Sequence, residues 1–69
     1  MNNNLGKLIK EQRTKKNLSL RGLAKQIDIG RMTLSRIEKG TRYILLSDII
    51  KIAQVLELDF KEILESYGD

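Results

Sequence analysis

The sequence predicts an all-α protein of five short helices, and three features of its 69 residues indicate this class. Apolar residues recur at spacings of three and four, which place them on one face of a helix. Polar or glycine-containing joints separate these periodic segments, and the chain holds no proline. Hydrophobic residues make up 41% of the chain, which favours a folded core over disorder. We therefore expect one compact domain over residues 1–69.

The first helix is expected over residues 5–16. An asparagine before it, Asn3 or Asn4, can accept a hydrogen bond from a free backbone N–H and so cap the helix. Gly6 is expected to weaken the first turn slightly. Asn17 follows the helix and tolerates the left-handed conformation that often ends one. The face toward the core is expected to carry Leu5, Leu8, Ile9 and Gln12.

The second helix is expected over residues 20–27, with Ser19 as its N-cap. Ala24 supplies the small residue that two helices crossing at a steep angle need where their backbones approach. Asp28 follows, and aspartate is among the few non-glycine residues that tolerate the positive φ of a sharp turn. This pattern predicts a helix-turn-helix rather than a generic helical hairpin. Its core positions are Leu23, Ile27, Ile29, Leu34 and Ile37.

The third helix is expected over residues 31–39, between Gly30 as N-cap and Gly40 as C-terminal stop. At 100° per residue, Leu34 and Ile37 point inward. The opposite face has no role in forming a core, because it carries cations, hydroxyls and one methionine. Its residues are Arg31, Met32, Thr33, Ser35, Arg36 and Lys39.

The last two helices are expected over residues 46–56 and from Asp59 to about Tyr67. Asp59 and Glu62 have the spacing of a capping box. The apolar positions of the fourth helix are Ile49, Ile52, Ala53 and Leu56, and those of the fifth are Phe60, Ile63 and Leu64.

Charge is unevenly distributed along the chain. Residues 1–42 hold eleven Lys and Arg against three acids, a net charge of +8, whereas residues 43–69 have a net charge of −4. A basic face is typical of a protein that binds the phosphate backbone of nucleic acid, although ordinary surface solubility would also explain it. With no cysteine or histidine, an enzyme, a metal site and a cofactor are not expected. No membrane span or secretory signal is evident, so we expect a cytoplasmic protein.

The stretches LSLRGLAKQIDIGRMTLSRIEKG and DIIKIAQVLELDFKEIL resemble the Cro/repressor-type (XRE-like) helix-turn-helix family. The resemblance extends from Leu5 to Leu64. It implies a lambda-repressor-like five-helix fold acting as a dimer on palindromic double-stranded DNA, with the third helix in the major groove. A DNA-binding transcriptional regulator, with repression as the expected mode, follows from it. By position, the residues expected to read bases are Arg31, Met32, Ser35 and Arg36.

Other roles follow from the same resemblance. Arg13 and Glu38 match a pair that braces the third helix in the family. Leu20 departs from it, because many members carry a glutamine there that bonds a phosphate. The residues expected to contact phosphates are Ser19, Thr33, Lys39, Arg42 and Tyr43, although Tyr43 also fits a role in capping the core.

The run Ile44–Leu46 is more apolar than a surface linker needs. We interpret Ile44, Leu45, Leu46 and Leu58 as a dimerisation patch, with simple core filling as the alternative. The apolar patch and the acidic C-terminal half also fit a second class of protein, an interaction module such as an antitoxin whose main target is another protein. Salt-dependent binding to duplex DNA separates the two classes.

Overall fold

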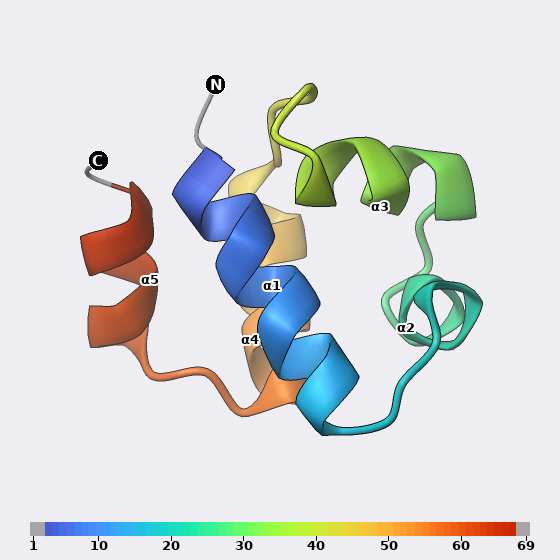
Figure 1. Cartoon of the computed structure of the whole chain (residues 1–69), viewed down its shortest axis with the longest axis horizontal. Helices are drawn as coiled ribbons and strands as arrows, with labels where there is room; N and C mark the ends of the chain where they lie inside the picture. The colour runs from blue at the N-terminus through green and yellow to red at the C-terminus, as the bar shows by residue number, and fades with distance from the viewer. Residues whose placement is uncertain (1–2, 68–69) are drawn as a thin grey trace.

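The computed structural model describes residues 3–67, and all the regular structure in that range is helical, which confirms the predicted all-α class. In Figure 1, α1 crosses in front of α4, with α5 on one side and the pair α2 and α3 on the other. The whole measures 27 × 23 × 20 Å. The helices are α1 (Asn3–Lys15), α2 (Leu20–Gln26), α3 (Arg31–Glu38), α4 (Leu46–Leu56) and α5 (Phe60–Tyr67).

The predicted caps and turns set most helix ends. The hydroxyl of Ser19 accepts a hydrogen bond from the backbone N–H of Gly22 at 2.9 Å, which caps α2. The carboxylate of Glu62 accepts one from the backbone N–H of Asp59 at 3.1 Å, as a capping box requires. The three predicted turn residues have positive φ, at Asn17 (58°), Asp28 (56°) and Gly40 (75°).

Several features of the helix ends were not predicted from the sequence. Helix α1 already includes Asn3 and Asn4, so the expectation that either one caps it is wrong. Tight packing of the turn around Leu5 against the rest of the protein holds it helical, and the helix therefore starts upstream of the predicted cap. Glu57 after α4 takes a left-handed φ of 56°, although only glycine does so without steric cost. The ends of α1, α2 and α3 lie one residue earlier than predicted and α5 starts one residue later, an ordinary margin for helix boundaries.

All five helices or their caps contribute to one core. The buried apolar side chains of the described range are aliphatic and follow the predicted helical spacing. The fifth helix differs from prediction, because Ile63 is buried while Phe60 and Leu64 are exposed. The buried apolar residues are Leu5, Ile9, Leu23, Ala24, Ile27, Leu34, Ile37, Ile52, Leu56 and Ile63.

Gly6 has a role that the sequence did not reveal. A Cβ atom at this position would lie 2.5 Å from the carbonyl oxygen of Ile37 and 2.6 Å from that of Glu38, both in the backbone of α3. Only a residue without a side chain lets α1 approach α3 so closely. The absence of a side chain at Gly6 therefore allows the C-terminal end of α3 to pack directly on the first helix.

Candidate nucleic-acid interface

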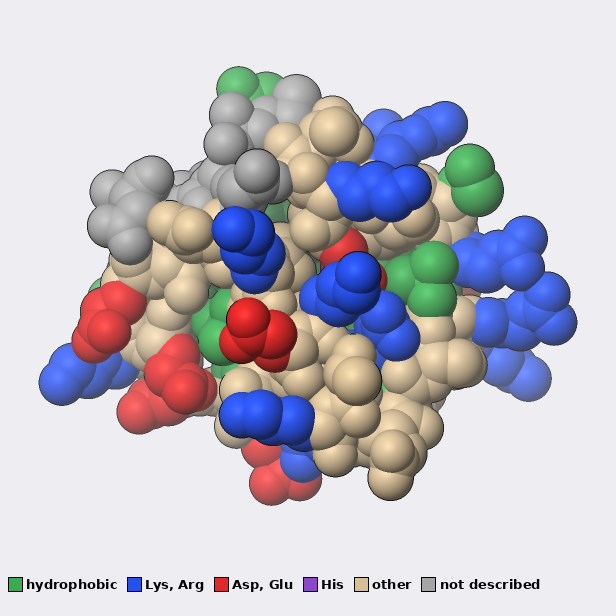
Figure 2. All heavy atoms as spheres, viewed as in Figure 1, with side chains coloured by type: hydrophobic (Ala, Val, Ile, Leu, Met, Phe, Trp, Pro, Cys, Tyr) green, Lys and Arg blue, Asp and Glu red, His purple; other side chains and the backbone are tan. Residues whose placement is uncertain are grey.

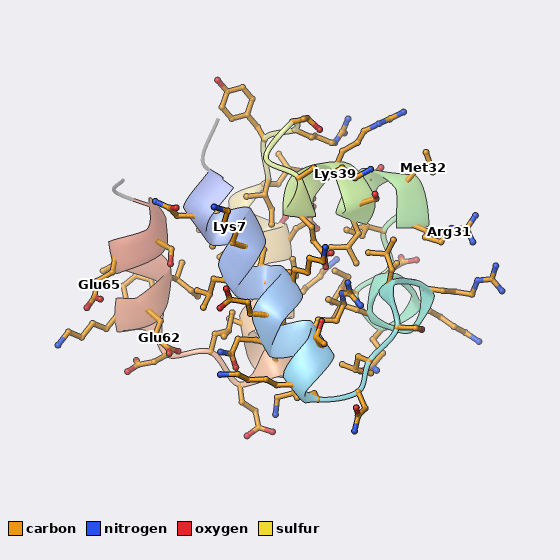
Figure 3. All side chains as sticks on the ribbon, in the orientation of Figure 1. Lys7, Arg31, Met32, Lys39, Glu62 and Glu65 are labelled. Carbon is orange, nitrogen blue, oxygen red and sulfur yellow. The ribbon has the colours of Figure 1, made fainter. Side chains whose placement is uncertain are left out.

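Helix α3 presents one face to the core and one to solvent. Leu34 and Ile37 are buried, and they fix the rotation of the helix about its axis. Figure 3 shows Arg31 and Met32 at one end of α3 and Lys39 at the other, all directed away from the core. Met32 is 59% exposed, so it lies on the outer face of the helix.

The structure brings the residues predicted to read bases together on this outer face. Arg31, Met32 and Arg36 are exposed and Ser35 is half-buried. Among the residues predicted to contact phosphates, Ser19, Lys39, Arg42 and Tyr43 are exposed and Thr33 is half-buried. Tyr43 is 75% exposed, so it does not cap the core.

Charge is segregated in space as well as in sequence. Lys and Arg side chains gather over α2 and α3 in Figure 2, whereas Asp and Glu gather mainly over and below α5. Figure 3 identifies Glu62 and Glu65 on α5 as members of the acidic side. Two exposed cations on α2, Arg21 and Lys25, join the basic side although motif positions did not single them out. Their only signal in the sequence was the high net charge of the first 42 residues.

Arg13 of α1 forms an ion pair with Glu38 of α3. The guanidinium donates from Nε to Oε2 at 2.7 Å and from Nη2 to Oε1 at 3.1 Å, a bidentate geometry. Its Nη1 also donates to the backbone carbonyl of Leu18 at 2.9 Å, in the joint before α2. One side chain thus connects α1, the start of the helix-turn-helix and the end of α3.

A second surface is apolar and lies between α4 and α5. Both helices pack against α1 but make few contacts with each other. The groove that remains has a volume of about 390 Å³, and Leu46 and Leu58 from the predicted dimerisation patch line it. Ile44 lines an adjoining cavity of about 370 Å³, whereas Leu45 is exposed and lines neither of the two. The groove is also lined by Ile49, Ile50, Ala53, Gln54, Glu57, Phe60 and Ile63.

Residues 3–67 contain no group of His, Cys, Asp and Glu side chains arranged to hold a metal ion. None of the helices described is both long enough and apolar enough to span a membrane.

Helices α2 and α3 are joined by a tight turn at Asp28, and α3 exposes a cationic, hydrogen-bonding face. These features are those of a DNA-binding protein of the helix-turn-helix class. Comparison with known proteins agrees, because the helix-turn-helix family model matches residues 9–63. The chain belongs to this family, in its XRE-like group, and is a DNA-binding transcriptional regulator. No curated protein matched the sequence.

A solved structure supports the same family. The chain is similar to the crystal structure of the restriction-modification controller protein C.AhdI from Aeromonas hydrophila, with a TM-score of 0.80 and 32% sequence identity. The match covers 87% of this chain and 91% of that one. The likeness therefore extends over the α4–α5 half as well as the helix-turn-helix.

Proposed function

We propose that this chain is a repressor that binds a palindromic operator as a symmetric homodimer, with α3 of each copy in the major groove. The observation that carries the proposal is the outer face of α3. It combines two arginines, a hydroxyl and an exposed methionine on a helix whose inner face is buried. Such a rigid, polar helix fits the major groove, which admits one α-helix.

Base reading is assigned to the exposed face of α3. Arg31 and Arg36 can each donate two hydrogen bonds to O6 and N7 of guanine, the commonest specific contact in the major groove. Met32 has no donor, and its apolar end suits a thymine methyl group. Ser35 can donate to a base or accept from one. Together they would read one half-site.

Phosphate contacts would fix the position of α3 without reading sequence. The hydroxyl of Ser19 accepts the N–H of Gly22, so its own hydrogen remains available for a phosphate oxygen. Lys39 and Arg42 are exposed at the C-terminal end of α3 and in the loop after it, and Tyr43 can donate through its phenol. Thr33 would donate at the other end of the helix. We assign the Arg13–Glu38 pair the role of a brace that holds α3 in register with these contacts.

The dimer is assigned to the apolar surface of α4 and α5. Symmetric pairing requires one patch to meet its own copy, and the groove with its exposed rim offers both a hollow and projecting side chains. Leu46, Ile50 and Phe60 are each more than half exposed and would be covered. Two copies joined in this way could present both α3 helices to half-sites about 34 Å apart.

Selection of binding sites from a random duplex pool tests the proposal directly. We expect a twofold-symmetric consensus with half-sites one helical turn apart. Affinity for the selected duplex should fall steeply with salt, and transcription from a promoter that overlaps the site should decrease when protein is added. Tight association with a protein partner, combined with no salt-dependent duplex binding, would instead establish the interaction-module function.

A further inference from the structure

A polar hollow opens between α1, α2 and α3, beside the face assigned to DNA. Its volume is about 190 Å³, against about 30 Å³ for a water molecule in the liquid. The wall from α3 carries Ser35 and Lys39, and the wall from α1 carries Lys10 and Arg13. Leu20 and Glu38 complete the lining. The hollow is large enough for a tetrahedral oxyanion and is open to solvent.

The charges around this hollow favour an anion. Three cations and one carboxylate line it, a net charge of +2. The carboxylate of Glu38 is already engaged by Arg13 through two hydrogen bonds. Among the described residues, the ammonium groups of Lys10 and Lys39 have neither an ion pair nor a hydrogen bond partner. Two ammonium groups without a partner therefore line a site whose one carboxylate, that of Glu38, is already paired.

The part of the lining formed by Leu20 offers no hydrogen bond to an anion. The apolar side chain of Leu20 lines the hollow at the start of α2 and can neither donate nor accept a hydrogen bond. An oxyanion here would have to be held from the sides, by the ammonium groups of Lys10 on α1 and of Lys39 at the C-cap of α3. These donors come from two different helices, so they would hold the anion only where the two helices meet.

We infer that this hollow receives a phosphate of the DNA backbone, held by Lys10 of α1 together with Lys39, the C-cap residue of α3. Lys10 thereby joins the interface as a positioning residue that no motif places there. This inference rests on the proposed function, because Ser35 and Lys39 border the face that would read bases. A DNA strand whose backbone runs from that face toward α1 would pass over the hollow. A phosphate bound there would fix the rotation of the protein on the duplex.

Binding measured at several salt concentrations tests the role of Lys10, with the selected operator and an unrelated duplex of equal length. The variant Lys10→Ala should reduce the slope of log affinity against log salt by about 0.9, the value for one phosphate contact. At about 0.15 M salt this corresponds to a roughly fivefold loss of affinity, equal for both duplexes. Lys10→Arg keeps the cation and should restore the wild-type slope.

The matched control is Lys61→Ala, which removes the same charge from an exposed position on α5. It should leave the slope within error of the wild type, and thermal unfolding should show that both variants fold. If Lys10→Ala behaves like Lys61→Ala while the wild type binds DNA, the inference is overturned and the proposed function stands. A loss of affinity in Lys10→Ala that is confined to the operator would also overturn it, because a phosphate contact carries no sequence information. Absence of duplex binding by the wild type would instead reject the proposed function.

Discussion

The Nε atom of Arg13 on α1 lies 2.7 Å from Oε2 of Glu38 at the end of α3, and both side chains are largely buried, at 13% and 6% exposure. The two residues are 25 positions apart in sequence. The carboxylate would be costly at this depth without its partner, because burial penalises an unpaired charge. The pair therefore ties the orientation of α3 to the first helix.

Removing one partner should destabilise the protein more than replacing both. We expect Glu38→Ala to lower the free energy of unfolding by about 3 kcal/mol, because it leaves the Arg13 guanidinium largely buried and without its ion pair. The double variant Arg13→Met/Glu38→Leu should lose clearly less, since it removes both charges and keeps the volume. Urea unfolding of the three proteins measures this. A double variant less stable than Glu38→Ala would contradict the brace.

Gly6→Ala should destabilise the protein although alanine favours helices. The added Cβ would meet two backbone carbonyls of α3 at 2.5 and 2.6 Å, so α1 and α3 must separate. Overpacking of this kind costs about 1–3 kcal/mol. Lys7→Ala, at the exposed neighbouring position, is the matched control and should change stability by less than about 0.5 kcal/mol. Equal melting temperatures for both variants would show that the close approach is not required.

Gly30→Ser should stabilise α3. Gly30 occupies the N-cap with an extended backbone, and it provides no side chain to bond the free N–H groups. A Cβ there would lie 3.5 Å from Oγ1 of Thr33, an ordinary contact, so serine fits without strain. We expect a gain of a few tenths of a kcal/mol, the usual difference between the two caps. Thermal unfolding checks this, and a lower melting temperature would count against the cap geometry.

Arg36→Ala and Lys39→Ala should separate base reading from phosphate binding. Loss of Arg36 should relax preference at one base pair of each half-site by about 1–3 kcal/mol. Loss of Lys39 should weaken binding to operator and unrelated duplex by the same factor and lower the salt slope by about 1. Repeating the site selection with each variant distinguishes them. An unchanged consensus for Arg36→Ala would remove this residue from the reading face.

Phe60→Glu should convert the proposed dimer into a monomer. The side chain is 69% exposed, so the charge is tolerated in the folded monomer but not in a covered apolar interface. Analytical ultracentrifugation should show the change, and operator affinity should fall because each copy would read half a site. Tyr43→Glu adds the same charge at an exposed position that does not line the groove, and it should leave the sedimentation unchanged. A wild type that sediments as a monomer at all concentrations would reject the dimer.

Local features were predictable because each depends on a few neighbouring residues. The cap at Ser19 and the turn at Asp28 follow from the chemistry of one side chain and from backbone sterics. Apolar spacing fixed which faces of α3 and α4 are buried. The same periodicity predicted the polar outer face of α3, because a face left polar beside a buried one must point to solvent. The base-reading roles on that face came from the resemblance to the helix-turn-helix family.

The chain by itself thus determined the five helices, the turn and the polar outer face of α3, whereas only the tertiary structure decided how distant segments meet. Gly6 could not be recognised, because its constraint comes from carbonyls of α3 more than thirty residues away. The same holds for Lys10, which joins Lys39 only when α1 packs on α3. Phe60 and Leu64 repeat at helical spacing like core residues, yet α5 packs on α1 in a rotation that buries Ile63 and leaves these two exposed. Periodicity predicts that a helix has an apolar face, but the volume available inside a small core decides how much of that face is covered.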